Sequence, residues 1–179
     1  MAVHSDRRRI ENYIPRLYGY AFSLCGDVHD AHDLVQETAL KALNSARVPD
    51  DEPAYRAWLF KILRNTWLDV VRRRSRRLAV VENGADYESI GTPVWAHDDS
   101  LISSLTVKLC LTKLSPAHRE VLGLVDVSGF SYGEAAVILD VPVGTVTSRV
   151  ARARNAMLAH LASGNILQFP AERQRQEAL

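Results

Sequence analysis

Residues 131–157 read SYGEAAVILDVPVGTVTSRVARARNAM and form the most informative segment of the chain. It predicts two short helices around a tight turn, because Asp140 and Pro142 interrupt the helical periodicity. Ala136 is the small residue that lets the two helices approach each other. The second helix is expected to have one buried stripe, formed by Val146, Val150, Ala153 and Met157. The stretch is interpreted as a helix-turn-helix.

The opposite face of the second helix is polar and basic. It carries Gly144, Ser148, Ala151, Arg152 and Asn155, flanked by Thr145, Thr147 and Arg149. Such side chains suit the major groove of DNA, where they reach base edges and phosphates. The alternative is an amphipathic hairpin whose arginines are merely solvated. A solvated face usually mixes both signs of charge, whereas Arg149, Arg152 and Arg154 stand alone here.

Length and composition indicate one or two small globular domains in a chain of 179 residues. No apolar run approaches the roughly 18 residues that a membrane span requires, and residues 1–11 are too charged for a secretory signal. We therefore expect a cytoplasmic protein without membrane insertion. Cys25 and Cys110 lie far apart in the sequence, which fits a reducing compartment.

The net charge of +1 hides a strong segregation of charge along the chain. Residues 27–53 hold seven acids against Lys41 and Arg47, a net charge of −5. Residues 54–77 hold eight bases against Asp69 alone, a net charge of +7, and residues 78–101 return to −5. One intensely basic segment within a near-neutral chain is typical of a nucleic-acid-binding face.

The apolar periodicity predicts an all-α fold of two small helical domains. Helices are expected near residues 6–25, 28–45, 54–76, 101–112, 116–127, 131–139 and 144–161. Residues 78–100 break the pattern with turn residues and a cluster of acids, which indicates a flexible linker. The predicted division is a first domain over 6–77, this linker, a second domain over 101–161, and a polar C-terminal tail over 162–179.

The basic segment is expected to form a helix with two distinct sides. The inward side is predicted to hold Tyr55, Leu59, Ile62, Leu63, Thr66 and Val70. The second stripe holds Trp58, Lys61, Asn65, Asp69, Arg72 and Arg76. An aromatic ring beside an amide and several cations matches what an unpaired DNA strand needs, a stacking surface and charge neutralisation. The alternative is that Trp58 is a core tryptophan and the run Arg72–Arg74 is a solvated helix end.

The acidic helix presents a different surface. Its inward face is predicted to hold Val28, Ala31, Val35, Thr38, Ala39 and Ala42, with Asp30, Asp33, Glu37, Leu40 and Asn44 outside. An exposed leucine among carboxylates is a candidate docking site for a partner with a basic, partly apolar groove. The alternative is an ordinary surface leucine.

Three segments together resemble a known family. They read DAHDLVQETALKA (residues 30–42), YRAWLFKILRNTWLDVVRRR (residues 55–74) and LSPAHREVL (residues 114–122), the last followed by the helix-turn-helix. Through them the chain resembles the extracytoplasmic-function (ECF, group 4) branch of the sigma-70 sigma factors of bacterial RNA polymerase. The three segments are similar to region 2.2, regions 2.3 and 2.4, and region 4. The resemblance covers about residues 10–161.

The resemblance implies an alternative sigma factor that binds core RNA polymerase, recognises the −35 and −10 promoter elements and helps melt DNA to initiate transcription, as in a stress response. Region 2.2 implies polymerase contacts by Asp33, Gln36, Glu37 and Leu40. The loop over residues 44–49 would capture a flipped base of the downstream element, and the residues implied for this element and its melting are Asn44, Arg47, Trp58, Lys61, Arg64, Asn65, Arg72, Arg73 and Arg76. Region 4 implies base contacts by Thr147, Ser148 and Arg152, and phosphate contacts by Thr145 and Arg149.

The resemblance also implies regulation by an anti-sigma factor. In the free or inhibited state the two domains would fold together or be held by an anti-sigma factor that covers the polymerase-binding helix, and on the polymerase they would spread apart. Two departures from the family pattern stand out. Asp140 occupies a turn position where glycine is usual, and aspartate tolerates the left-handed conformation better than most residues. The downstream-element loop ends in the acidic run Asp50–Glu52.

Two other functions remain open. A sigma-like decoy would sequester an anti-sigma factor, but such decoys usually adjoin a phosphoacceptor domain, for which 179 residues leave no room. A conventional operator-binding regulator would use the helix-turn-helix alone and leaves residues 30–76 unexplained. An enzyme is not expected, and neither is a cofactor or a metal. His29, His32 and Cys25 lack an evident fourth ligand.

Overall fold

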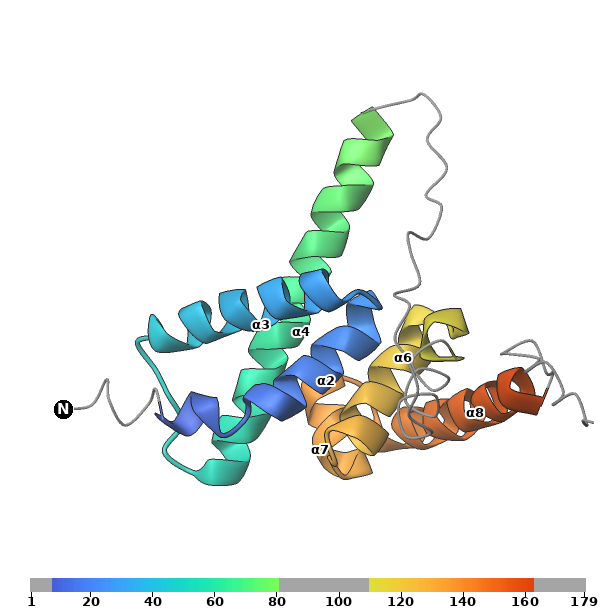
Figure 1. The fold of residues 1–179 in the computed structure, drawn as a ribbon. Helices are drawn as coiled ribbons and strands as arrows, with labels where there is room; N and C mark the ends of the chain where they lie inside the picture. The colour runs from blue at the N-terminus through green and yellow to red at the C-terminus, as the bar shows by residue number, and fades with distance from the viewer. Residues whose placement is uncertain (1–7, 81–109, 163–179) are drawn as a thin grey trace, which may run out of the picture.

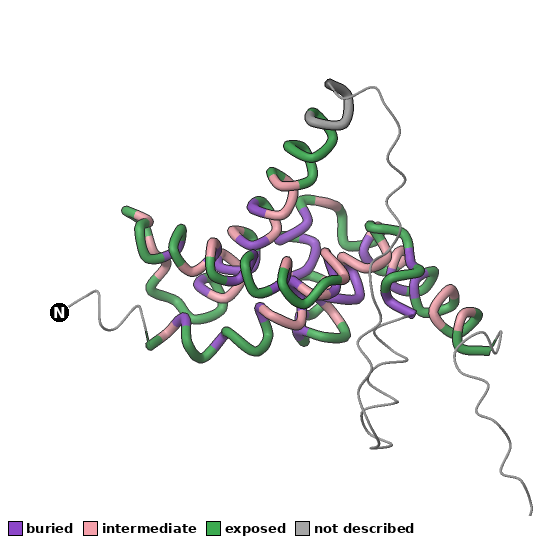
Figure 2. Tube along the Cα trace, turned by 45° about the horizontal axis from the view of Figure 1, so that its top comes forward, coloured by how far each residue is buried: buried purple, intermediate pink, exposed green. Residues whose placement is uncertain are grey.

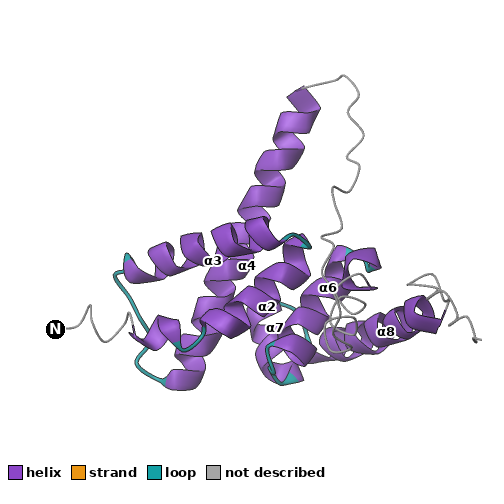
Figure 3. Ribbon diagram, viewed as in Figure 1, coloured by secondary structure: helices purple, strands orange, loops and turns teal. Residues whose placement is uncertain are grey.

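The computed structural model describes residues 8–80 and 110–162 (Figure 1). Its elements are α2 (Ile14–Cys25), α3 (Val28–Leu43), α4 (Glu52–Val80), α6 (Pro116–Leu122), the π-helix η1 (Gly123–Val127), α7 (Tyr132–Leu139) and α8 (Val143–Ala162). Residues 8–11 and 110–113 are also helical. No strand occurs in the described ranges (Figure 3), and the all-α prediction is confirmed. None of the helices described is long and apolar enough to cross a membrane.

Several predicted helix boundaries differ from the structure. The helix expected over residues 6–25 is interrupted by a turn at Asn12–Tyr13, because Pro15 lacks an N–H and its ring excludes a continuous helix. The helix expected over 54–76 begins at Glu52 and continues to Val80, so the expected end of the first domain at residue 77 falls inside α4. The rest of the predicted linker, and the tail after Ala162, lie outside the described residues.

Residues 8–80, here called the N-terminal unit, form a bundle in which α3 packs against α2 and crosses α4 (Figure 1). Its buried core comes from all three helices: Leu17, Tyr20, Ala21, Leu24, Ala31, Leu34, Val35, Ala42, Tyr55, Leu59, Phe60 and Leu63. Beyond this core α4 projects as a single helix, and residues 71–76 are exposed (Figure 2). The basic run of the sequence therefore stands clear of the bundle.

The acidic helix α3 begins at a side-chain cap. The Asp27 carboxylate accepts hydrogen bonds from the backbone N–H groups of His29 (2.8 Å) and Asp30 (2.9 Å). The hydrogen bond from the Asp30 N–H is the main cause that lowers the pKa of Asp27, with a further contribution from that of His29. Asp27 therefore fixes the start of the helix that carries the candidate partner surface.

Replacing the cap is expected to have a pH-dependent cost. Asp27→Ala should lower the free energy of unfolding by about 1 kcal/mol at neutral pH. Because the pKa of Asp27 is lowered in the folded chain, this stabilisation is present above the ordinary carboxyl pKa and is lost as the pH falls through the lowered value. Denaturant unfolding of both proteins from neutral pH to about pH 3 measures the difference. Asp27→Asn is the control, because it keeps a side-chain oxygen that can accept the two hydrogen bonds. If the free energies of unfolding of Asp27→Ala and the unaltered chain differed by the same amount at every pH, the assigned role of the Asp27 carboxylate would be contradicted.

Residues 110–162, here called the C-terminal unit, contain the helix-turn-helix in α7 and α8. Ser131 and Glu134 form a reciprocal capping box at the start of α7. The residue between the helices, Asp140, has φ 57° and ψ 51°, so it takes the left-handed conformation without glycine. The helix-turn-helix interpretation is confirmed, and its buried residues are Ala135, Ala136, Ile138, Leu139, Val146, Val150 and Ala153.

The two units pack against each other. The Phe60 ring of α4 meets the edge of the Phe130 ring, which lies just before α7, with centroids 4.7 Å apart and an interplanar angle of 78°. Both rings are buried, and one hydrophobic core runs through both units (Figure 2). The described chain is therefore in the folded-together arrangement, one of the two expected states.

Candidate nucleic-acid interface

The outer face of α8 is available to a ligand. Val146, Val150 and Ala153 are buried and Met157 packs against the core, as the stripe predicts. On the opposite side, Thr147 and Arg152 are exposed, whereas Thr145, Ser148 and Arg149 are half-exposed. All five candidate residues for the upstream element therefore lie on α8 with surface exposure.

Two hydroxyl groups of this face are bonded within the helix. Thr147 Oγ1 donates to the Val143 carbonyl (3.1 Å), and Ser148 Oγ donates to the Thr145 carbonyl (3.0 Å). Each hydroxyl oxygen also has acceptor lone pairs, so it can accept a further hydrogen bond without giving up the one it donates.

Arg154 corrects one prediction about this face. Its guanidinium binds the Asp126 carboxylate through Nη2–Oδ1 (2.6 Å) and Nε–Oδ2 (3.2 Å). The hydrogen bonds that Arg154 donates to the Asp126 carboxylate raise the pKa of Arg154 above the ordinary arginine value. Arg154 therefore does not stand alone, and Arg149 and Arg152 are the arginines of α8 for which the described residues show no ion pair.

The candidate DNA-binding residues near the start of α4 are divided by the fold. Lys61 and Asn65 are exposed. Trp58 is half-buried, and its ring packs on Tyr55 with centroids 5.5 Å apart. Arg64 is held by the other unit, since its Nε donates to Glu120 Oε1 (2.8 Å). The structure thus brings Trp58, Lys61 and Asn65 to one surface and separates Arg64 from them.

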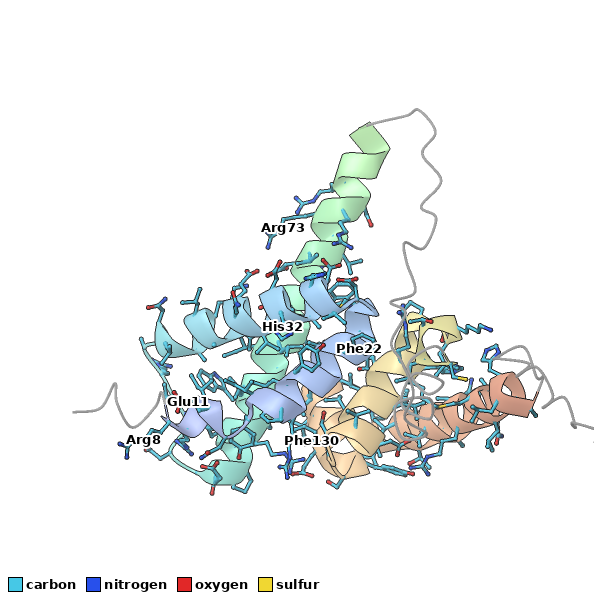
Figure 4. The ribbon with its side chains drawn as sticks, in the orientation of Figure 1. Arg8, Glu11, Phe22, His32, Arg73 and Phe130 are labelled. Carbon is cyan, nitrogen blue, oxygen red and sulfur yellow. The ribbon has the colours of Figure 1, made fainter. Side chains whose placement is uncertain are left out.

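The arginines at the far end of α4 lie along their own helix. Arg72 Nη1 contacts Asp69 Oδ1 (3.4 Å), Arg73 Nε donates to the Asp69 carbonyl (3.3 Å), and Arg76 Nε donates to the Arg72 carbonyl (3.3 Å). All three arginines are exposed, and Figure 4 shows Arg73 on the projecting half of α4. Such exposed contacts contribute little to stability.

The candidate base-capturing loop is anchored at its acidic end by Arg9. This guanidinium donates to the carbonyls of Pro49 (3.0 Å) and Asp50 (2.9 Å) and to Glu52 Oε2 (2.8 Å). Tyr13 donates its hydroxyl proton to Glu52 Oε1 (2.6 Å). Burial and this bond raise the pKa of Tyr13 to about 12. Of the acids that end the loop, Glu52 is therefore neutralised by Arg9, which bonds Asp50 only through its backbone carbonyl.

The candidate side chains of that loop, Asn44 and Arg47, are exposed on the surface. Asn44 caps α3 through its backbone N–H, and both Asn44 and Arg47 are exposed. Ser45 Oγ donates to the Arg47 carbonyl (3.1 Å), which shapes the turn between them. An amide and a guanidinium on a held loop can bind the edges and phosphate of an extruded nucleotide.

The acidic face of α3 is exposed as predicted at its centre. Leu40 is 61% exposed, and Asp33 and Gln36 are also exposed. Glu37 pairs with Lys41 (3.0 Å). The face therefore combines an apolar contact with carboxylates, the combination required for docking a basic partner.

The inward face of α3 differs from the prediction at two positions. Val28 is 40% exposed, because it follows the Asp27 cap at the end of the helix, and Leu34 is buried instead. A groove of about 180 Å³ lies between α3 and α4, lined by Asp30, Asp33, Leu34, Glu37, Trp67, Val70 and Arg74. Arg74 closes one side by binding Asp30 (3.0 Å).

Several contributing residues have no signal in the local pattern. Arg9, Arg74 and Glu120 act through partners at least 40 residues away in sequence. The capping box of α7 is different, since the spacing S-x-x-E at residues 131–134 is a known helix-start signature. Within residues 8–80 and 110–162 no group of three potential metal ligands comes together, and His32 packs against Tyr18 instead (Figure 4).

Comparisons with known families agree with this geometry. The family Sigma-70 region 2 matches residues 9–77, and Sigma-70, region 4 matches residues 104–157. The chain is 39% identical to the ECF RNA polymerase sigma factor EcfG of Rhodopseudomonas palustris over 151 residues, which cover 83% of this chain and 80% of that protein. It is 34% identical to the ECF RNA polymerase sigma factor SigE of Mycolicibacterium smegmatis over 167 residues, which cover 90% of this chain and 63% of that longer protein.

Solved structures give the same result. The chain is similar to the sigma factor RpoE from Bartonella quintana, crystallised in complex with the anti-sigma factor NepR, with a TM-score of 0.69 and 32% identity. That similarity covers 88% of this chain and 96% of that one. CnrH, in complex with the cytosolic domain of CnrY, has a TM-score of 0.54 and 28% identity.

Proposed function

This chain belongs to the ECF branch of the sigma-70 family, and from that membership we propose that it directs core RNA polymerase to promoters with two separated elements and helps open the DNA. Sigma factors are not enzymes, so the chain contributes binding energy rather than chemistry. The observation that carries the proposal is the presence, in one chain, of an exposed acidic-apolar helix, a basic helix with a surface tryptophan, and a basic recognition helix.

The surface proposed to bind the polymerase is the outer face of α3. Asp33, Gln36, Glu37 and Leu40 lie together there, and Leu40 is the apolar centre. A clamp element of the polymerase with basic and apolar side chains would complement this face. Carboxylates increase the rate of encounter with such a partner, while burial of the leucine slows dissociation.

The surfaces proposed to bind promoter DNA are on α4, its preceding loop and α8. Asn44 and Arg47 would hold an extruded base, and Trp58, Lys61, Arg64 and Asn65 the separated strand. Arg72, Arg73 and Arg76 stand on the projecting helix, where they would bind the phosphates of the adjoining duplex. On α8, Thr147, Ser148 and Arg152 would read bases, while Thr145 and Arg149 bind phosphates.

An anti-sigma factor is the proposed regulator. The solved relatives RpoE and CnrH are bound to NepR and CnrY, and the exposed α3 face of this chain offers a surface for which such a protein would compete with the polymerase. We expect such a protein to act in the cytoplasm, where the polymerase works.

Run-off transcription of genomic DNA tests the proposal. Core RNA polymerase with the purified chain should produce new RNA 5′ ends that share two spaced upstream elements, and core polymerase alone should not. No new starts, with polymerase that is active with another sigma factor, would contradict the proposal and favour a decoy that binds only an anti-sigma factor. Binding to duplex DNA without polymerase would instead favour an operator-binding regulator.

Replacing two arginines of α8 should affect DNA binding in different ways. Arg152→Ala should weaken binding to the upstream element by about 1–3 kcal/mol and relax sequence preference at one position. Arg149→Ala should weaken binding to all sequences alike and reduce the slope of log affinity against log salt by about 1. Titration of polymerase carrying each variant with matched and mismatched duplexes measures both. Equal discrimination by the Arg152 variant and the unaltered chain would contradict the base-reading role.

A further inference from the structure

The loop between α3 and α4 is held at its end by a side chain from another part of the chain. Arg9 lies in the helical turn of residues 8–11, and its Nη1 and Nη2 donate to the carbonyls of Pro49 (3.0 Å) and Asp50 (2.9 Å). Its Nε donates to Glu52 Oε2 at the start of α4 (2.8 Å). One guanidinium therefore joins this helical turn both to the loop and to α4.

The loop has few other hydrogen bonds that fix its backbone. At its beginning, the Ser45 N–H donates to the Ala42 carbonyl (3.2 Å), and Ser45 Oγ donates to the Arg47 carbonyl (3.1 Å). No backbone–backbone hydrogen bond holds residues 46–50 among the residues that the structure describes. A segment with so few hydrogen bonds opens easily unless a side chain restrains it. The position of the second half of the loop accordingly depends on Arg9.

The same guanidinium packs on the ring that supports Trp58. Arg9 Cζ lies 3.9 Å from the centroid of the Tyr55 ring, which is buried. The Trp58 ring packs on this same tyrosine, with centroids 5.5 Å apart. A cation over an aromatic face is attracted by the ring, so Arg9 fixes the loop relative to Trp58.

Arginine suits this position better than lysine would. Its planar guanidinium presents several donors in a fixed fork and also stacks on rings, whereas the lysine ammonium is a compact charge on a flexible stem. The Arg9 side chain is 20% exposed, and its donors are directed at two carbonyls and a carboxylate of the protein. Arg9 is therefore placed to hold the protein rather than to bind DNA.

We propose that Arg9 is a positioning residue for recognition of the downstream promoter element. By holding the loop that carries Asn44 and Arg47 in place relative to Trp58, it sets where an extruded base lies relative to the separated strand. A loop already held in its binding conformation spends less conformational entropy on capture of the base. The inference rests on the function proposed above, because that function supplies the ligand of the loop.

Arg9→Lys tests the anchoring in the free chain. Lysine keeps the positive charge, so attraction to DNA phosphates is retained while the fork is lost. The NMR order parameters of the backbone amides of Arg47, Val48 and Asp50 should fall toward about 0.6, a value typical of flexible backbone. Arg8→Lys is the matched control, because Arg8 is exposed in the same helical turn (Figure 4). Unchanged order parameters of the loop in Arg9→Lys would overturn the proposal.

Oligonucleotide binding tests the recognition role. Polymerase carrying each variant is titrated with a single-stranded oligonucleotide of the downstream element, and with copies in which one base at a time is replaced by an abasic site. The abasic site that weakens binding of the unaltered chain most marks the captured base. Arg9→Lys should bind the intact oligonucleotide at least about 5-fold more weakly than the unaltered chain does. Both proteins should bind the oligonucleotide without the captured base equally, and Arg8→Lys should match the unaltered chain throughout.

The abasic oligonucleotide separates positioning from a general structural role. If Arg9→Lys weakened binding of the intact and the abasic oligonucleotide by the same factor, Arg9 would only support the fold and the positioning role would be wrong. Unchanged binding of both oligonucleotides by Arg9→Lys would also overturn it. If none of the proteins bound any oligonucleotide while the loop of Arg9→Lys became flexible, the proposed function would be wrong and the anchoring by Arg9 would stand.

Discussion

Leu40→Asp should weaken binding to core RNA polymerase at least about 30-fold, because a hot-spot residue at the centre of an interface contributes about 2 kcal/mol or more and we expect Leu40 to be one. Leu40 is 61% exposed, so the aspartate meets water in the free chain and the fold should be preserved. In the complex the same carboxylate would be buried beside Glu37 and Asp33, where it adds repulsion to the lost contact. Titration of labelled chain with core polymerase measures the change.

A second exposed leucine provides the control for that experiment. Leu158 lies on α8 and is 62% exposed, so Leu158→Asp makes the same chemical change at the same exposure. We expect it to retain polymerase affinity and circular-dichroism melting like those of the unaltered chain. Equal losses of affinity in both variants would show that Leu40 acts only as a surface leucine, and the α3 docking surface would then be wrong.

The fold was predictable where local periodicity decides it. The α8 stripe of Val146, Val150 and Ala153 is buried as the spacing indicates, and Asp140 tolerates the left-handed turn. Helix ends were less predictable. The Asp27 cap makes Val28 the first residue of α3, where its side chain is exposed to solvent. Phe60 was absent from the predicted inward face because one of the two rings that pack on it, Phe130, belongs to the other unit.

The candidate site was likewise predictable only where a single helix determines it. Exposure of Leu40, Thr147 and Arg152 follows from helix geometry alone and matches the structure. The pairing of Arg154 with Asp126, and of Arg64 with Glu120, depends on contacts between residues 28 and 56 positions apart. No single-helix pattern contains that information, so a run of arginines in sequence overstates the charge that remains free on the surface.

The Trp58 ring on α4 is expected to contribute strongly to binding of the separated DNA strand. Trp58→Ala should lower the affinity of the polymerase complex for a single-stranded oligonucleotide of the downstream element about 5–150-fold, since stacking on a base is worth about 1–3 kcal/mol. Trp58→Phe should keep most of the affinity, because a ring remains.

Lys61→Ala should instead reduce the slope of log affinity against log salt by about 0.7, the value for one single-strand phosphate.

Trp67 separates stacking on DNA from a structural role of the tryptophan. It is half-buried on the same helix as Trp58 but lines the groove beside α3, so Trp67→Ala removes a ring of the same size from the other side. If Trp58 is only a core residue, both alanine variants should lose thermal stability and oligonucleotide affinity in parallel. If Trp58 stacks on the separated strand, the two variants should have similar losses of stability, while only Trp58→Ala loses affinity for the oligonucleotide. Half-burial is compatible with the second outcome, because a ring held on one side by Tyr55 is fixed in orientation and spends less entropy on binding a base on the other.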